Sequence, residues 1–234
     1  MMLKYINSKT SFIAGLIFGI LILCTIGFFI VLGILLKDKG LEKDSANTND
    51  AVVVQEDGQN IPQLTITKDD HVRGNKNASI VFFEYSDFEC SFCARFHPNM
   101  KKLAEEFDDQ IAWVYRHFPL RSIHQQAQPA AEASECVASL GGDSAFWKFI
   151  DELYDNIGNY SDALYSSLAR EAGVDVKEFE ACFKAGTFSD KVNNDYQSGL
   201  QNGVQGTPAT FINGQLVPGA VSYEQLKTFV ESQL

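Results

Sequence analysis

The sequence predicts an α/β domain in which a helical insertion separates the two halves of a small sheet, preceded by one membrane-spanning helix. Two short β-branched and aromatic runs flank a stretch with helical spacing, and a long helical stretch follows them. A strand–turn–strand pattern and a closing helix then end the chain. Ahead of all of these lies an apolar segment without a single charge.

The composition is that of a packed and strongly acidic protein. The chain has 234 residues, a hydrophobic fraction of 45% and a formal net charge of -11. This length is sufficient for one domain with a sizeable core after an N-terminal segment is set aside. Because so acidic a surface repels phosphate backbones, nucleic acid is excluded as an expected partner.

The N-terminal segment has the length of a transmembrane anchor. Residues 11–36 are uncharged and almost entirely apolar, and a helix needs about 20 such residues to cross a bilayer. A cleaved signal peptide has a shorter apolar region and a small-residue cleavage site, which we do not find. We therefore expect an uncleaved anchor over residues 11–36, after an N-terminal cytoplasmic tail over 1–10. The polar residues 37–63 are expected to form a flexible tether.

The folded domain is expected to occupy residues 64–234, with a helical insertion at about 121–187. Strands are predicted at 80–83 and 111–115, with a helix at 92–107 between them. A long helical stretch over 124–202 is broken near Gly141-Gly142, Gly158 and Gly186. Asn213-Gly214 predicts a tight hairpin turn between strands at 208–213 and 216–217, and a helix at 223–233 closes the chain.

Cys90-Ser91-Phe92-Cys93 lies directly after the first predicted strand, where a helix begins. The unpaired N–H groups and the macrodipole at a helix N-terminus stabilise a thiolate, which is the attacking species in disulfide exchange. Cys90, nearer the helix start, is expected to be the exposed nucleophile, and Cys93 to resolve the mixed disulfide. The alternatives are an inert loop disulfide and half of a zinc site.

Two further segments are expected to complete the site. Glu84 lies on the strand before the cysteines, and a buried carboxyl there could exchange a proton with Cys93; the alternative is a glutamate at the surface end of the strand. Thr207-Pro208 opens a late strand, where a cis proline would leave the edge of Thr207 free to bind an extended substrate. A trans proline at a strand start is the alternative.

Together these residues resemble the DsbA-like family of the thioredoxin superfamily. The resemblance implies a thioredoxin fold with an inserted helical domain, in which Cys90 is the nucleophile, Cys93 the resolving cysteine and Glu84 the buried acid. It also implies a cis Pro208 beside Thr207, and substrate contacts from Ser91 and Phe92. Ser91 stands where relatives often carry proline, and Phe92 where a histidine would help to stabilise the thiolate. The motifs are Glu84–Cys93, Tyr115-Arg116-His117-Phe118-Pro119-Leu120, Gln128–Ala133, Gly203–Gly214 and Pro218-Gly219-Ala220.

Two other cysteines, Cys136 and Cys182, fall on separate predicted helices of the insertion. A structural disulfide between them would connect these helices, and some DsbA-like relatives carry a second bond of this kind. Such a bond would suit an oxidising compartment. The alternative is a pair of buried free thiols that behave as small hydrophobes.

The redox chemistry implies a function outside the cytoplasm. We expect a protein disulfide oxidoreductase held by a single-pass anchor in the bacterial inner membrane, its C-terminal domain extracytoplasmic. Its clients would be reduced or misoxidised extracytoplasmic proteins, and a membrane protein of the DsbB or VKOR type would reoxidise it. No organic cofactor and no metal are expected, and a monomer is the expected state. The alternatives are a reductase or isomerase, and a copper- or zinc-binding module that uses Cys90, Cys93 and His97.

Overall fold

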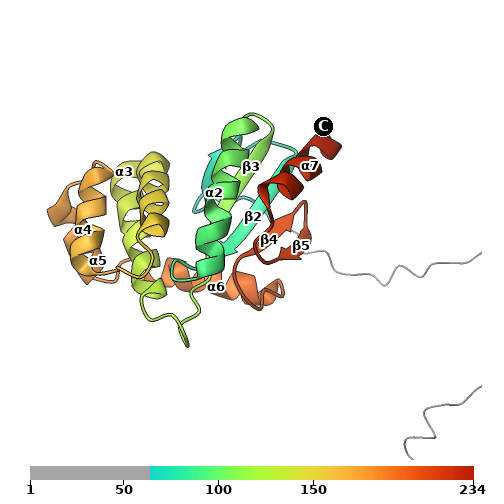
Figure 1. Ribbon diagram of the computed structural model, residues 1–234. Helices are drawn as coiled ribbons and strands as arrows, with labels where there is room; N and C mark the ends of the chain where they lie inside the picture. The colour runs from blue at the N-terminus through green and yellow to red at the C-terminus, as the bar shows by residue number, and fades with distance from the viewer. Residues whose placement is uncertain (1–63) are drawn as a thin grey trace, which may run out of the picture. The chain divides into compact units, whose positions relative to one another are not determined.

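The computed structural model describes residues 64–234, which form a five-stranded sheet with helices on both faces (Figure 1). The predicted tail, anchor and tether at 1–10, 11–36 and 37–63 lie outside the described residues. The strands are β1 His71–Gly74, β2 Ile80–Ser86, β3 Ile111–His117, β4 Ala209–Ile212 and β5 Gln215–Pro218, and the helices are α2 Ser91–Glu106, α3 Ala127–Asp155, α4 Asp162–Glu171, α5 Val176–Lys184, α6 Ser189–Gln201 and α7 Tyr223–Gln233.

The sheet has the strand order β1-β3-β2-β4-β5. β2 and β3 are parallel and joined through α2, whereas β4 runs antiparallel to β2. Tyr85 near the end of β2 pairs with Ala209 at the start of β4. The register therefore brings the loop before β4 to the end of β2, where α2 begins. The predicted α/β fold with a helical insertion is confirmed.

Side chains of β2 point alternately to the two faces of the sheet and so belong to two different hydrophobic cores. Phe82 lies in the core beneath α2, α3 and α7, whereas Phe83 and Tyr85 lie in a smaller core on the opposite face. Because side chains alternate between the faces of a strand, Glu84 and Ser86 project to the same side as Phe82. Both polar residues are buried, so β2 carries a carboxyl and a hydroxyl into the main core.

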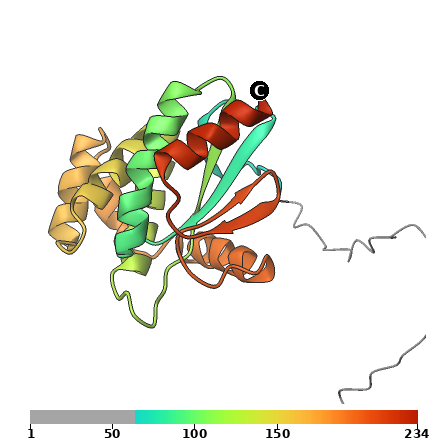
Figure 2. The ribbon, with the colours of Figure 1, turned by 45° about the vertical axis from the view of Figure 1, so that its right-hand side comes forward.

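The helices cover both faces closely. α2 and α7 lie side by side on one face (Figure 2), and α6 packs on β3 from the other. At Gly199 of α6, an ideal Cβ atom would lie 2.6 Å from the Phe118 ring. Glycine is required there because any side chain would push α6 away from the sheet.

The insertion is built around α3. This helix bends at Gly142, whose φ of 73° falls in the left-handed region that glycine favours, and α4 and α5 pack against it. Cys136 of α3 and Cys182 of α5 form a disulfide with a Cα–Cα distance of 5.9 Å. The bond therefore connects two helices through cysteines that are 46 positions apart in the sequence.

The structure differs from the sequence prediction in three places. β1 was not predicted, because a four-residue edge strand that begins with His71 has no alternating apolar pattern. Gly173, with a φ of 90°, ends α4 where no break was expected. β4 begins at Ala209, one residue after the predicted start at Pro208. Among residues 64–234, no helix is long and apolar enough to cross a bilayer.

Replacing both Cys136 and Cys182 with serine should destabilise the domain by about 2–4 kcal/mol, because the unfolded chain then loses a constraint on a loop of this length. Thermal or urea unfolding of the oxidised chain measures the loss, with Ser139→Ala on the same helix as a control that leaves the disulfide in place. An equal stability of the double variant and the parent would contradict a structural role for the bond.

Candidate active site

Cys90 and Cys93 lie at the start of α2. Cys90 is the N-cap residue, with extended backbone angles, and its carbonyl accepts the first helical hydrogen bond from Ala94 N at 3.0 Å. Cys93 lies one turn further on, and its side chain is 0% exposed. Both cysteines are free thiols, so the two sulfurs lie at the helix N-terminus in different environments.

The surroundings of Cys90 favour its thiolate. A hydrogen bond from the Cys93 thiol is the largest cause, and it lowers the pKa of Cys90 to about 5. The Thr207 side chain and the backbone N–H groups of Phe92 and Cys93 add to the effect, while partial burial opposes it. Unpaired N–H groups at a helix start stabilise a negative charge in this way. With this pKa, the reduced Cys90 sulfur is a thiolate at neutral pH.

Cys93 is held in the opposite state. Burial and the adjacent Cys90 raise its pKa well above the ordinary value for a thiol. A hydrogen bond from Ser86 acts against this shift. Cys93 therefore stays protonated until a base accepts its proton, and the pair shares a single negative charge located on Cys90.

The loop before β4 completes the surroundings of Cys90. The Thr207–Pro208 peptide bond is cis, and the Cys90 thiol donates a hydrogen bond to the Thr207 carbonyl at 3.4 Å. The Thr207 hydroxyl is buried without a hydrogen-bond partner among the described residues. It is free to donate to sulfur when Cys90 loses its proton, which explains its effect on the pKa of that residue.

An open groove runs beside this loop. Its volume is about 430 Å³, and it is lined by residues 203–209, Leu216, Pro218 and Gly219. Phe92, in the first turn of α2, is 56% exposed, with the Arg95 guanidinium 4.4 Å from its ring centre. Ser91 is exposed in the same turn. A groove and an exposed aromatic ring therefore lie near Cys90. Cys90 itself is only 6% exposed, so the expectation of an exposed Cys90 is wrong, because the Thr207 carbonyl lies against its sulfur.

Glu84 lies within the main core and is 0% exposed. Its Oε2 accepts a hydrogen bond from Trp113 Nε1 at 2.8 Å, and its Oε1 has no partner among the described residues. Burial raises the pKa of the carboxyl to about 7, although the Ser86 hydroxyl and the Trp113 N–H oppose the shift. At this pKa the carboxyl can both accept and return a proton near neutral pH. The alternative of a surface glutamate is excluded by its burial.

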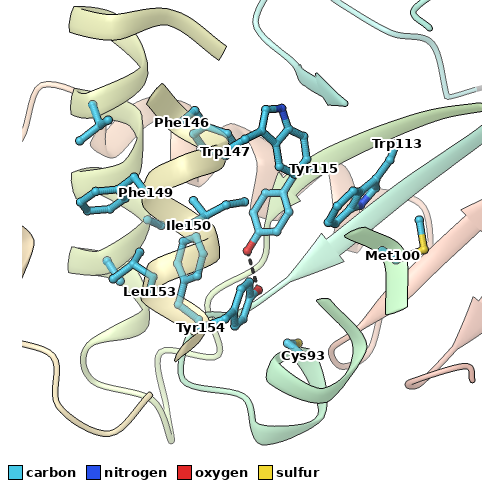
Figure 3. Packing of buried hydrophobic residues seen from close by; sticks show 14 of the residues in the cluster. Cys93, Met100, Trp113, Tyr115, Phe146, Trp147, Phe149, Ile150, Leu153 and Tyr154 are labelled. Carbon is cyan, nitrogen blue, oxygen red and sulfur yellow. Dashed lines mark hydrogen bonds between the residues drawn. The ribbon is translucent and has the colours of Figure 1, made fainter. Parts of the chain in front are cut away.

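Sequence reasoning missed three hydroxyl groups next to these residues. Ser86 of β2 forms a hydrogen bond of 2.9 Å with the Tyr154 hydroxyl, which forms another of 2.7 Å with Tyr115. Figure 3 shows the two tyrosine hydroxyls facing each other between α3 and the sheet. Ser86 could have been found from its position two residues after Glu84 on one strand face. Tyr154 belongs to the distant insertion, and nothing in the sequence connects it to the site.

Asp87 and Glu89 organise the loops around the cysteines. The Asp87 carboxylate accepts hydrogen bonds from the backbone N–H groups of Glu89 and Leu120, both at 2.7 Å, and also contacts the His124 ring. The Glu89 carboxylate accepts hydrogen bonds from two backbone N–H groups at the start of α3. These two acids attach the cysteine loop to the beginning of the insertion.

His97, named above as a possible third metal ligand, is turned into the core. Its Nε2 lies 2.7 Å from Asp151, and its ring lies against Tyr154. In the described part of the chain, the one group with metal-ligand geometry is His117, Glu135 and Asp195, which contains neither cysteine. A cation already occupies the neighbourhood of this group: Lys191 Nζ lies 2.7 Å from Asp195 and 3.5 Å from Glu135.

Comparison with known proteins agrees with this geometry. A family model described as "Thioredoxin" matches residues 66–232. The chain belongs to the thioredoxin family. The expected membership of the thioredoxin superfamily is thereby confirmed.

Solved structures share the fold. The thiol–disulfide exchange protein alpha-DsbA2 from Wolbachia pipientis is 22% identical, with a TM-score of 0.63 over 70% of this chain and 86% of that protein. BdbD from Bacillus subtilis is 20% identical, with a TM-score of 0.65 over 72% and 95%. The catalytic domain of ScsC from Proteus mirabilis is 24% identical, with a TM-score of 0.60 over 71% and 90%. At these identities the likeness is one of fold.

The curated relatives are larger proteins. The chain is 33% identical over 163 residues to the Na(+)/H(+) antiporter NhaA 1 of Salinispora arenicola, which is 70% of this chain and 24% of that protein. It is 34% identical over 147 residues to the NhaA 1 of Mycolicibacterium vanbaalenii. The chain thus spans about a quarter of the length of these relatives.

The pKa of Cys90 predicts its reactivity. The alkylation rate of Cys90 by iodoacetamide in the reduced chain should rise with a midpoint near pH 5, because the thiolate is the reacting species. Thr207→Val should move this midpoint upward, whereas Thr210→Val should not; Thr210 is also buried with an unpartnered hydroxyl, but it is not among the groups that act on Cys90. Peptide mass spectrometry measures each cysteine separately. A midpoint between pH 8 and 9 would contradict a stabilised thiolate.

The raised pKa of Glu84 predicts a pH-dependent cost in stability. A carboxyl with a folded-state pKa of about 7 gives its full stability below pH 4, and that stability is lost as pH rises through 7. Glu84→Gln should therefore raise the free energy of unfolding by about 2–3 kcal/mol at pH 8, and the gain should vanish near pH 4.

Glu135→Gln is the contrasting control for this experiment. Its carboxylate is also buried, but hydrogen bonds from His117 and His71 outweigh the effect of burial and lower its pKa. Replacing it should therefore destabilise the chain at pH 7, and the loss should shrink as pH falls. Unfolding curves at several pH values give both differences. A Glu84→Gln variant with no pH-dependent gain would show that the Glu84 pKa is not raised.

Proposed function

We propose that this chain is an extracytoplasmic thiol–disulfide oxidase that gives the Cys90–Cys93 disulfide to client proteins. The observation that supports the direction is the opposite ionisation of the two thiols, with the pKa of Cys90 lowered and that of Cys93 raised. Stabilising the Cys90 thiolate stabilises the reduced protein, and a disulfide whose reduced form is stabilised is a strong oxidant. The same stabilisation makes Cys90 a good leaving group.

The reaction begins at the exposed end of α2. A client thiolate attacks the Cys90 sulfur of the disulfide, the Cys90–Cys93 bond breaks, and Cys93 leaves with the bonding electrons. Cys93 then takes up a proton, because its buried position does not tolerate a thiolate. A second client thiolate attacks the client sulfur, so that the client gains a disulfide and Cys90 leaves as the thiolate.

Glu84 is proposed as the acid for this sequence. Its carboxyl lies in the same core as Cys93 and is half-protonated near pH 7. It can therefore supply the proton that Cys93 needs and accept it again when the enzyme is reoxidised. We propose that the client lies as an extended strand along Thr207, with Pro208, Ser91 and Phe92 as further contacts.

We further propose that the chain is held at the bacterial inner membrane by residues 11–36, with residues 37–63 as the tether. The apolar length of this segment supports the proposal. The lysines on both sides do not decide its orientation. The Cys136–Cys182 disulfide supports an oxidising compartment for the C-terminal domain.

The proposed partners follow from this placement. Clients are reduced or misoxidised extracytoplasmic proteins, and a membrane protein of the DsbB or VKOR type accepts the electrons from the reduced Cys90–Cys93 pair. The redox equivalent is the disulfide itself, so we propose that no organic cofactor and no metal take part. The chain is proposed to act as a monomer. We do not extend the name of the antiporters to it, because the shared segment is about a quarter of those proteins.

Replacing Cys93 with serine should trap clients on Cys90. Without the resolving thiol, the mixed disulfide between Cys90 and a client persists, so non-reducing gels of membrane fractions should contain high-mass adducts that a reductant dissolves. Cys90→Ser is the control and should form none. Failure of the Cys93→Ser variant to form any adduct would contradict the proposed exchange with protein clients.

A further inference from the structure

The proposed chemistry requires a proton path inside a sealed core. Cys93 and Glu84 are both 0% exposed, and Ser86, Tyr115 and Tyr154 are buried around them. Bulk water does not reach Cys93 directly across this packing, yet its proton must leave and return in each cycle. The groups available for this transfer are the buried hydroxyls of Ser86, Tyr115 and Tyr154.

Ser86 is the hydroxyl best placed for the transfer. It follows Glu84 by two residues and projects from the same face of β2. It also lies on the strand that leads into the cysteine loop, and the buried Glu84 Oε1 on that strand is left without a partner among the described residues. The strand thus carries one hydroxyl group two residues after a carboxyl whose Oε1 is unpartnered, at the end that leads into the cysteine loop.

The tyrosine pair is placed to orient the Ser86 hydroxyl. Tyr154 lies 2.9 Å from Ser86 Oγ and 2.7 Å from the Tyr115 hydroxyl. Burial raises the pKa of both tyrosines well above their usual value, so neither ionises. When Tyr115 donates to Tyr154 and Tyr154 donates to Ser86, the Ser86 hydrogen is left for Glu84 or Cys93. Figure 3 shows the two tyrosines in this core together with Cys93.

We propose that Ser86, oriented by Tyr154, is the proton relay between Cys93 and Glu84; this inference rests on the proposed thiol–disulfide exchange. The Ser86 hydroxyl acts on both ends of the path, since it lowers the pKa of Glu84 and that of Cys93.

The step balances in both directions. When reduced enzyme resolves a mixed disulfide, a Cys93–Cys90 bond forms and the bond from Cys90 to the partner sulfur breaks, with the partner leaving as a thiolate. The Cys93 proton passes to Ser86 Oγ while the Ser86 hydroxyl proton passes to the Glu84 carboxylate. In the oxidase direction the same protons return, from Glu84 to Ser86 and from Ser86 to the departing Cys93. The two cysteines exchange one electron pair with the partner.

Single-turnover reaction of the reduced full-length chain in detergent with glutathione disulfide separates the two steps. Acid quenching and mass spectrometry measure first the formation of the Cys90–glutathione adduct and then its resolution by Cys93. In the parent, resolution should accelerate with a midpoint near pH 7, where Glu84 becomes a base. In Ser86→Ala it should be roughly tenfold to a hundredfold slower and lose this midpoint, while adduct formation keeps its rate.

Two variants separate a relay from a packing role. Ser86→Thr keeps the hydroxyl and should restore most of the rate and the pH midpoint. Ser134→Ala removes a hydroxyl that is equally buried but bonded to the Ala131 carbonyl, and it should change neither step. If Ser86→Ala does not fold, Tyr154→Phe decides: a several-fold slower resolution supports the relay.

The relay would be overturned if Ser86→Ala resolved the adduct at the rate and pH midpoint of the parent. If only Tyr154→Phe folds, the same result for that variant would overturn it. A parent chain that forms no adduct at Cys90 would instead contradict the proposed function and would leave no resolution step to compare. The two failures are therefore distinguishable within one experiment.

Discussion

The site depends on the different ionisation of two cysteine thiols in one helical turn. Cys90 stands at the N-terminus of α2, where backbone N–H groups and the Cys93 thiol stabilise a thiolate, whereas Cys93 is enclosed and remains protonated. Glu84 is buried in the same core, and the proposed proton exchange with Cys93 would require a carboxyl beneath α2. The raised pKa of that carboxyl costs stability at neutral pH, as expected of a group retained for chemistry.

The rest of the fold positions this turn. The parallel β2–α2–β3 unit directs the helix N-terminus to the edge of the sheet, and the antiparallel pairing of β4 with β2 brings Thr207 to Cys90. The insertion also contributes to the site, since Tyr154 of α3 reaches the hydroxyl of Ser86 on β2. Glu89 attaches the cysteine loop to the start of α3. Thioredoxin core and insertion therefore form one site together.

Much of this arrangement could be predicted from the sequence, and the exceptions have physical reasons. β2, α2 and β3 follow from composition and periodicity, and Asn213-Gly214 marks the β4–β5 turn through its left-handed backbone angles. The roles expected of Cys90 and Cys93 depend on local position at a helix start, which sequence order reveals. β1 was not predicted because its four edge residues show no regular pattern of apolar side chains. The role of Tyr154 was not predicted because its contact with Ser86 spans 68 residues, and a contact at that distance depends on tertiary packing.

The reduction potential of the Cys90–Cys93 pair tests the central claim most directly. The chain is equilibrated with glutathione buffers, and thiol alkylation followed by mass spectrometry gives the reduced fraction of each cysteine, with Cys136 and Cys182 as the internal reference that stays bonded. Because the stabilised Cys90 thiolate favours the reduced state, the account predicts a potential near about −120 mV, that of a strong oxidase. A value near about −270 mV, that of a reductase, would contradict it.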